Sequence, residues 1–131
     1  MNEDMEIRTH KKASSSFVGQ PISVTEGEAA VELKATEDMC VDDVGLIHGG
    51  FTFSVADYAA MLAVDDPNVV LASAKVRFMA PVRLGDTMRG FAKVMGSEGN
   101  RIQVAVEVSV KDTTVLEGDM ICYVLDKHVL L

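Results

Sequence analysis

A histidine and two adjacent glycines stand directly before an almost wholly apolar stretch that carries one carboxylate. These residues are His48, Gly49 and Gly50 and, seven positions past the second glycine, Asp57. Glycines at the start of a helix leave backbone N–H groups unshielded at the positive end of the helix dipole, where an oxyanion or a polarised carbonyl can bind. A carboxylate within an apolar helix is costly to bury unless it has a partner or a chemical role. The run therefore predicts a chemical site at the start of a helix.

Each of these residues also has a purely structural interpretation. Gly50, Ser54 and Asp57 recur at helical spacing and share one face. Their small side chains either leave room for a ligand or allow close packing with the carboxylate hydrogen-bonded inside. His48 can simply close a turn, and the glycines do not form a phosphate-binding loop because no Lys-Ser/Thr pair follows them. From the residues alone, catalysis and packing both remain open.

Helix geometry separates the two halves of this candidate site. The seven residues from Gly50 to Asp57 correspond to about 10 Å of helix rise. Side chains lean toward the helix N-terminus, which recovers only part of that distance. One chain therefore cannot bring its helix N-terminus and Asp57 within hydrogen-bond reach of the same reacting atom, as catalysis requires. If both take part, the site must straddle an interface between two subunits.

The pattern along the chain predicts one helix among short strands. The Ala-, Leu- and Met-rich stretch predicts a helix that ends before Pro67, because proline disfavours helical geometry in the residue before it. Alternation from Ile102 to Val110 is typical of a half-buried strand. We expect a hairpin, then one central helix, then an antiparallel meander of four strands, in which helix and sheet bury each other's apolar face. The expected spans are a hairpin of 22–24 and 30–35, a loop over 37–47, the helix over 51–64, and strands over 70–79, 87–95, 102–110 and 115–125.

Composition is that of one globular domain. The chain has 131 residues, of which 48% are apolar and 24% charged. Its net charge is −8 and it has no basic cluster, which argues against nucleic acid as a partner. Two cysteines and three well-separated histidines give no metal-ligand spacing. The apolar stretch is shorter than the roughly 20 residues that a membrane span needs, and the acidic N-terminus is not a secretory signal. We expect a cytoplasmic protein with no membrane partner, a polar and partly ordered segment over 1–16, and a single domain over 17–131.

Three segments resemble those of the hotdog-fold acyl-CoA thioesterases, in particular the group named for the phenylacetate-pathway thioesterase (PaaI-like). They are Gly45 to Gly50, the Ala56-Asp57 pair nine residues past the histidine, and Val76 to Asp86, within a similarity that runs from about Val18 to Leu125. The resemblance implies an α+β hotdog fold, in which a curved antiparallel sheet wraps a central apolar helix. It also implies a homodimer or a dimer of dimers, and hydrolysis of an acyl-CoA thioester without a metal or other cofactor.

By that resemblance, the site residues have distinct roles. The Gly49 N–H would polarise the thioester carbonyl, His48 would orient the thioester, and Asp57 of the other subunit would act as general base or nucleophile. The resemblance also implies a polar residue near Ser73 that helps to place the water. The remaining substrate-binding candidates are Gly50, Ser54 and Asp42.

Asp42 is a departure from the family pattern. The family usually has Asn six residues before the histidine, where this chain has Asp42. A carboxylate accepts hydrogen bonds but does not donate them, and it adds charge beside the site. The departure concerns substrate orientation and rate more than the fold.

A second resemblance points to a different function. Residues Leu71 to Phe91 also resemble the effector domain of the malonyl-CoA-responsive repressor of bacterial lipid synthesis, a hotdog domain that binds an acyl-CoA without hydrolysing it. The alternative to the enzyme is therefore a non-catalytic acyl-CoA-binding sensor or regulator. That repressor has no carboxylate at the position of Asp57, and the first 16 residues here are too few for its DNA-binding domain. Both points favour an enzyme.

Overall fold

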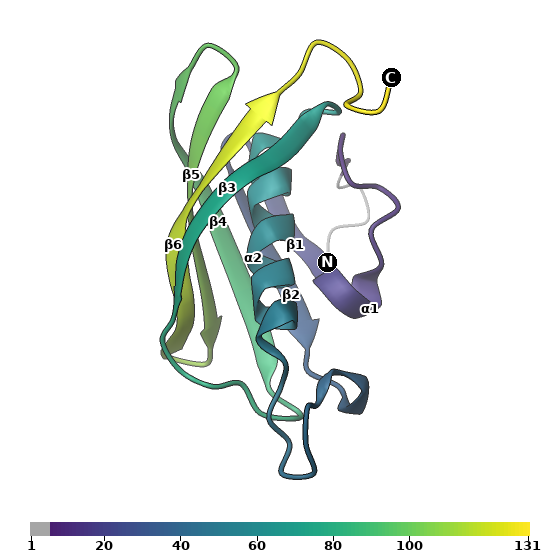
Figure 1. Cartoon of the computed structure of the whole chain (residues 1–131), viewed down its shortest axis with the longest axis vertical. Coiled ribbons are helices and arrows are strands. Elements are labelled where there is room, and N and C mark those ends of the chain that lie inside the picture. Colours follow the sequence, from purple (N-terminus) through teal and green to yellow (C-terminus); the bar gives the residue numbers. More distant parts are fainter. Residues whose placement is uncertain (1–5) are drawn as a thin grey trace.

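A six-stranded antiparallel sheet curls around one long helix in the computed structural model, which describes residues 6–131 (Figure 1). The strands lie in the order β1-β2-β4-β5-β6-β3. This arrangement confirms the predicted α+β hotdog fold with a central helix. The elements are α1 (Ser15–Val18), β1 (Gln20–Thr25), β2 (Glu28–Lys34), the short 3-10 helix η1 (Glu37–Met39), α2 (Gly49–Val64), β3 (Val69–Phe78), β4 (Thr87–Glu98), β5 (Arg101–Val110) and β6 (Thr113–Val124).

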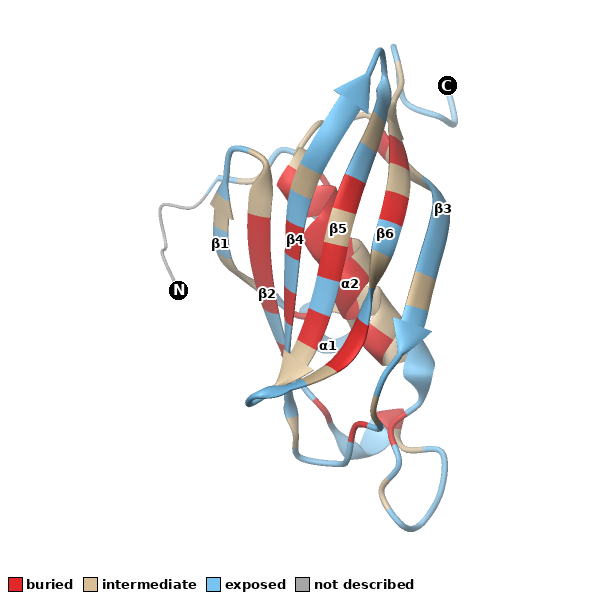
Figure 2. Ribbon diagram, turned by 90° about the vertical axis from the view of Figure 1, so that its left-hand side faces the viewer, coloured by how far each residue is buried: buried red, intermediate tan, exposed pale blue. Residues whose placement is uncertain are grey.

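Helix α2 is held by burial rather than by an amphipathic pattern. Nine of its sixteen residues are buried, and they lie on several faces because the sheet wraps around the helix (Figure 2). The helix ends where the sequence predicts. Asp65 adopts a left-handed conformation with φ 51°, and its N–H donates to the Met61 carbonyl in a C-terminal cap. Within the described residues, no helix is both long and apolar enough to cross a membrane.

The position of β3 corrects the predicted meander. Of the four strands after the helix, only β4, β5 and β6 follow one another as neighbours, whereas β3 pairs with β6 at the sheet edge and β4 pairs with β2. The reason lies in the connection after β3, which crosses below the N-terminus of α2 (Figure 1). It is fastened there by backbone hydrogen bonds from Ile47 to Val82 and from Leu84 to Gly45. Strand periodicity carries no information about such a crossing.

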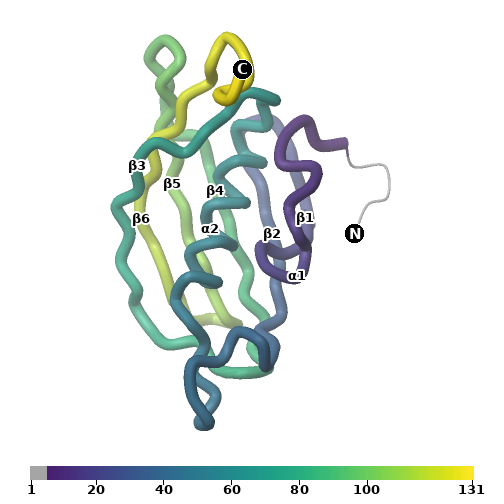
Figure 3. The backbone as a smooth tube through the Cα atoms, turned by 45° about the vertical axis from the view of Figure 1, so that its right-hand side comes forward, coloured from purple at the N-terminus to yellow at the C-terminus, as the bar shows by residue number. Residues whose placement is uncertain are grey.

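The N-terminal segment lies along α2, next to β1 (Figure 3). The Arg8 N–H donates to Asp65 Oδ1 at 2.7 Å, and Ser54 Oγ donates to the Phe17 carbonyl at 2.6 Å. Between these two anchors Thr9 is buried. The first five residues of the predicted 1–16 segment lie outside the described residues, and the partly ordered state of that segment stays a prediction.

Helix and sheet approach closely at a glycine of β4. A Cβ added at Gly90 would lie 2.6 Å from Val55 Cγ1 and 3.1 Å from the Val55 carbonyl oxygen. Gly90→Ala should therefore lower the free energy of unfolding by about 1–3 kcal/mol, the usual cost of overpacking. Urea denaturation at fixed protein concentration measures this. Gly96→Ala is the matched control on the same strand, because nothing lies within 4 Å of its added Cβ. Equal stability of the two variants would contradict the close packing.

Candidate functional site

His48 caps the N-terminus of α2. Its backbone is extended, and its Nδ1 accepts a hydrogen bond from the Gly50 N–H at 2.8 Å. Because Nδ1 is the acceptor, the ring hydrogen of the neutral imidazole is on Nε2. A side chain at position 50 would interfere with this cap, since an added Cβ would lie 2.8 Å from His48 Nδ1. The His-Gly-Gly sequence thus builds the first turn and holds the imidazole beside it.

Capping of Gly50 leaves the Gly49 N–H for a ligand. No acceptor contacts it among the described residues, as expected for an N–H in the first turn of a helix. Gly49 is exposed and borders a cavity of about 410 Å³ whose lining also includes Phe78 and Val82. A Cβ at Gly49 would lie 3.4 Å from the Phe78 ring, an ordinary van der Waals contact, so the first turn of α2 lies close to that ring. An oxygen bound here would meet a backbone donor at the positive end of α2.

Asp42 organises the loop that leads into the helix. Its Oδ1 accepts hydrogen bonds from the backbone N–H groups of Val44, Gly45 and Leu46 at 3.0–3.2 Å. These bonds, that from Leu46 above all, lower the pKa of the Asp42 carboxyl although the side chain is fully exposed to solvent. The loop continues through a bridge between Cys40 and Ile47 to His48. Asp42 is thus connected to the candidate site through the backbone of its loop.

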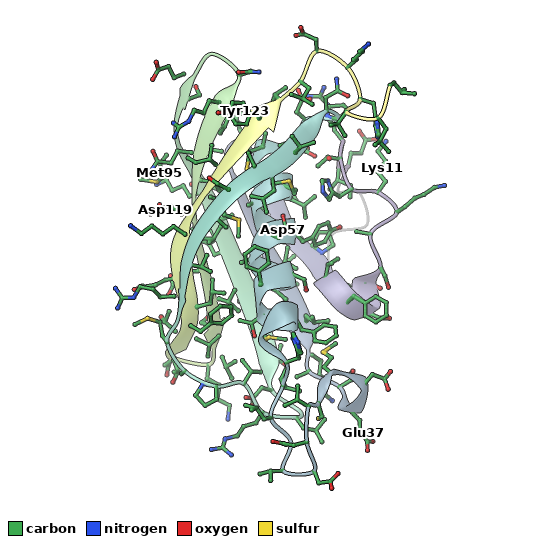
Figure 4. The ribbon with its side chains drawn as sticks, viewed as in Figure 1. Lys11, Glu37, Asp57, Met95, Asp119 and Tyr123 are labelled. Atoms are coloured by element: carbon green, nitrogen blue, oxygen red, sulfur yellow. The ribbon has the colours of Figure 1, made fainter. Side chains whose placement is uncertain are left out.

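Asp57 is a half-buried carboxylate without a hydrogen bond to its inner oxygen. Asp57 projects from the middle of α2 (Figure 4). Its Oδ1 is inaccessible to solvent and has no partner among the described residues. Burial raises the pKa of the Asp57 carboxyl, while the nearby His10 imidazole acts in the opposite direction. The negative charge of Asp57 also acts on the Cys122 thiol of β6. Burial, together with this charge, raises the pKa of the thiol to about 11. A desolvated carboxylate of this kind is a strong base for a proton brought within its reach.

The structure brings together only part of the predicted site in one chain. His48, Gly49 and Gly50 form the first turn, and Asp57 lies two turns further along α2. Ser54 lies between them, and its hydroxyl is hydrogen-bonded to backbone: Oγ lies within donating distance of the carbonyl oxygens of Phe17 and Phe51.

Ser73 lies apart from these residues. It pairs with Ile121, whereas the neighbouring Met120 and Cys122 are buried on the inner side of β6, so Ser73 lies on the sheet face away from α2.

Sequence reasoning missed the contribution of the N-terminal segment. His10 lies close enough to Asp57 for each to shift the pKa of the other. The Phe17 ring packs against Phe51 with the centroids 6.3 Å apart and the planes tilted by 39°. With His48, Phe17 also borders an apolar pocket of about 390 Å³. The sequence signal for either residue is weak, since a histidine and a phenylalanine in a polar segment show no periodicity. Over residues 6–131, no group of three or more His, Cys, Asp or Glu is arranged to hold a metal ion.

Comparison with known proteins assigns the family. The profile of the thioesterase superfamily matches residues 44–117, which is more than half of the chain and includes the first turn of α2 and Asp57. The chain therefore belongs to the thioesterase superfamily. Within it, the E. coli PaaI protein from the phenylacetic acid degradation operon superposes with a TM-score of 0.72 and 26% identity, over 79% of this chain and 81% of that one. This likeness confirms the predicted PaaI-like hotdog group.

Other relatives have diverse names. The uncharacterized protein PH1136 from Pyrococcus horikoshii superposes with a TM-score of 0.95 and 52% identity, over 97% of this chain and 98% of that one. A methylthioribose-1-phosphate isomerase of Aquifex aeolicus is 49% identical over 88% of this chain but only 25% of its own length. The transcription factor FapR of Thermoanaerobacter sp. is 29% identical over 88% of this chain and 58% of its own length. The chain thus spans between a quarter and three fifths of the length of these two curated relatives.

The loop geometry predicts different effects for two replacements of Asp42. Asp42→Asn keeps an oxygen that accepts the three N–H bonds, so the loop should persist, and any thioester hydrolysis by the protein should be preserved or raised as a negative charge leaves the candidate site. Asp42→Ala removes the acceptor, and amide hydrogen exchange over residues 43–47 should accelerate. Because the folded-state pKa of Asp42 is lowered, protection of this loop in the unmodified protein should be lost as pH falls through that pKa.

Asp43→Ala is the matched control for this pair. The Asp43 carboxylate is exposed next to Asp42, and it accepts no hydrogen bond within the described part of the chain. Exchange as slow in Asp42→Ala as in Asp43→Ala would contradict the role of Asp42 in the loop.

Proposed function

We propose that this protein is an acyl-CoA thioesterase that hydrolyses a thioester to a free acid and CoA. The observation that carries the proposal is the buried Asp57 Oδ1, on a helix whose first turn offers the Gly49 N–H; over residues 6–131 neither group has a hydrogen-bond partner. An unsatisfied buried carboxylate is costly, and it persists where chemistry uses it. Membership of the thioesterase superfamily supports the same reaction. A cytoplasmic location stays a prediction.

The reaction needs three contributions from these residues. The Gly49 N–H polarises the thioester carbonyl and stabilises the oxyanion that forms on it, while the His48 imidazole beside it orients the thioester. The Asp57 carboxylate removes a proton from water, whose oxygen attacks the carbonyl carbon, or it attacks that carbon itself. The C–S bond then breaks and the CoA thiolate leaves. When water is the attacking group, this step releases the free acid directly; when Asp57 attacks, it leaves an acyl-Asp57 anhydride, which water then hydrolyses to the free acid and the regenerated carboxylate.

These contributions come from two subunits in the proposed site. The helix rise of about 10 Å between the first turn and Asp57 prevents one chain from supplying both to one substrate. Two features support pairing of subunits. β3 is an edge strand of the sheet and is exposed over four successive residues, Ala72 to Lys75. Phe78 and Met79 at its end are large apolar side chains left exposed beside the first turn of α2. We propose a homodimer or a dimer of dimers.

A second candidate function is acyl-CoA sensing without hydrolysis. The likeness to the transcription factor FapR over 88% of this chain is the observation that favours it. The two functions differ in what they require of Asp57. A sensor needs the pocket and the N–H donors but has no use for a buried base.

A hydrolysis assay distinguishes the two functions. Over a panel of acyl-CoAs varied in chain length and aromaticity, free thiol should be released, and a chelator should not abolish release because backbone N–H groups and a carboxylate supply the chemistry. Asp57→Asn should lower kcat/KM by roughly 10² or more, the scale of general-base contributions. Folding should survive because an amide is less costly to bury than an unpaired charge.

Asp119→Asn is the control for the loss of a carboxylate. Asp119 is exposed on β6 and borders a hollow on the outer face of the sheet, away from α2 (Figure 4). This variant should retain full activity. Tight binding of several acyl-CoAs without cleavage would establish the sensor instead. Near-normal turnover by Asp57→Asn would remove Asp57 from the mechanism.

A further inference from the structure

Two cavities border the start of α2, on different faces of the helix. One, of about 410 Å³, is lined by Gly49 and Thr52, and the other, of about 390 Å³, is lined by Gly50 and Ser54. At about 3.6 residues per turn, positions 49 and 52 share one face and positions 50 and 54 share the opposite one. A thioester whose carbonyl binds the Gly49 N–H has two arms, the acyl group and the pantetheine of CoA. Each cavity can therefore take one arm.

The cavity beside Gly50 is walled by aromatic rings. The ring centroid of Phe51 lies 6.3 Å from that of His48, edge-on at 84°, and 6.3 Å from that of Phe17, tilted by 39°. His48 caps the start of α2, whereas the Phe17 carbonyl accepts from Ser54 Oγ, six residues and about 9 Å of helix rise further along. The wall thus leads from the thioester end of the site, at His48, to Phe17.

The polar groups around this cavity are already used within the described part of the chain. The Gly50 N–H donates to His48 Nδ1, and the Ser54 hydroxyl is bonded to backbone. The Phe17 N–H donates to the Ser14 carbonyl at 3.0 Å. The Nε2–H of His48 remains, at the end where the thioester binds. Pantetheine carries amide groups, which would lose their hydrogen bonds here, whereas an apolar acyl group loses none.

The cavity beside Gly49 suits the pantetheine arm instead. Irregular backbone of the connection after β3 lines it, including Ala80 and Pro81. The carbonyl oxygens of these two residues accept no hydrogen bond from any of residues 6–131. They are therefore acceptors for an amide N–H, which the cavity beside Gly50 does not offer.

Backbone contacts fix the position of Phe17. Gly19, two residues on, is buried with a φ of 97°, and an added Cβ would lie 2.7 Å from both the Glu32 carbonyl oxygen and Val31 Cγ1. The chain after α1 thus packs directly on β2, and the bond from Ser54 ties it to α2. The Phe17 ring itself is 54% exposed. Its size can therefore be changed while the backbone that carries it stays in place.

We propose that the cavity beside Gly50 binds the acyl group of the substrate, and that Phe17 is a specificity-determining residue that limits the length of this group. The inference rests on the proposed function and names its substrate class. That class is acyl-CoAs whose acyl group is apolar and short enough to end at Phe17, rather than long-chain or carboxylated ones.

A chain-length series tests the role of Phe17. With straight-chain acyl-CoAs from acetyl to palmitoyl, kcat/KM of the unmodified protein should fall once the chain reaches Phe17. Phe17→Ala should move this fall to longer chains and raise kcat/KM by about tenfold or more for the first excluded chain, the scale on which an apolar pocket discriminates one methylene. Phe17→Trp should move the fall to shorter chains. Acetyl-CoA should be cleaved equally by all three proteins, because its acyl group does not reach position 17.

Phe91→Ala is the matched control. Phe91 is a 41% exposed phenylalanine of β4 that borders a hollow on the outer face of the sheet, away from α2. Its removal should leave the chain-length profile unchanged. Circular dichroism checks the fold of each variant.

A binding series separates this proposal from the proposed function. S-alkyl-CoA thioethers of the same chain lengths have no carbonyl to hydrolyse, and isothermal titration calorimetry gives their Kd. The dependence of Kd on chain length should shift in opposite directions in Phe17→Ala and Phe17→Trp. If the unmodified protein cleaves no thioester, the proposed function fails, and the thioether series still decides whether the chain ends at Phe17.

Two results would overturn the proposal. Chain-length profiles that coincide for Phe17→Ala, Phe17→Trp and the unmodified protein would show that the acyl group lies elsewhere. An altered sedimentation coefficient of Phe17→Ala together with an unchanged profile would show that the ring packs against a second subunit instead of the substrate.

Discussion

Burial of α2 in the concave face of the sheet is the interaction on which the rest of the structure depends. The helix is apolar on nearly every side, and nine of its residues are buried, so it is stable only where the sheet surrounds it. Close approach at Gly90 follows from this packing. The same packing removes water from Asp57 and raises the pKa of its carboxyl, which gives an ordinary side chain the character of a base. Burial of α2 by the sheet thus both stabilises the fold and raises the pKa of the Asp57 carboxyl.

The two halves of the candidate site lie apart along one rigid helix, and each has its own surroundings. At its first turn, the His48 cap uses the Gly50 N–H, and the Gly49 N–H, beside a cavity, has no acceptor within the described part of the chain. Two turns away, Asp57 lies between the sheet and the N-terminal segment, next to His10. A helix of fixed rise cannot close the gap of about 10 Å between them. The edge strand β3 and the apolar side chains at its end support a second subunit as the element that closes it.

Features that depend on local sequence could be predicted, and features that depend on distant contacts could not. The helix, its end before Pro67 and the six strands follow from periodicity and from turn residues. The partner of β3 does not, because it is decided by a crossover fastened to the loop before α2. The pattern of β3 also hides a register shift between Leu71 and Ser73, and with it the face on which Ser73 lies. The approach of His10 to Asp57 depends on two anchors that join residues far apart in the chain, for which sequence gives no signal.

Mixed dimers test most directly whether one site is built from two subunits. Asp57→Ala and His48→Ala are unfolded together, refolded and assayed for thioester hydrolysis, with each variant refolded alone as the reference. Random pairing makes about half of the dimers mixed, and each mixed dimer has one intact site of two, so roughly a quarter of the unmodified activity should return. A mixture that stays inactive, while mass spectrometry confirms that mixed dimers are present, would contradict the shared site.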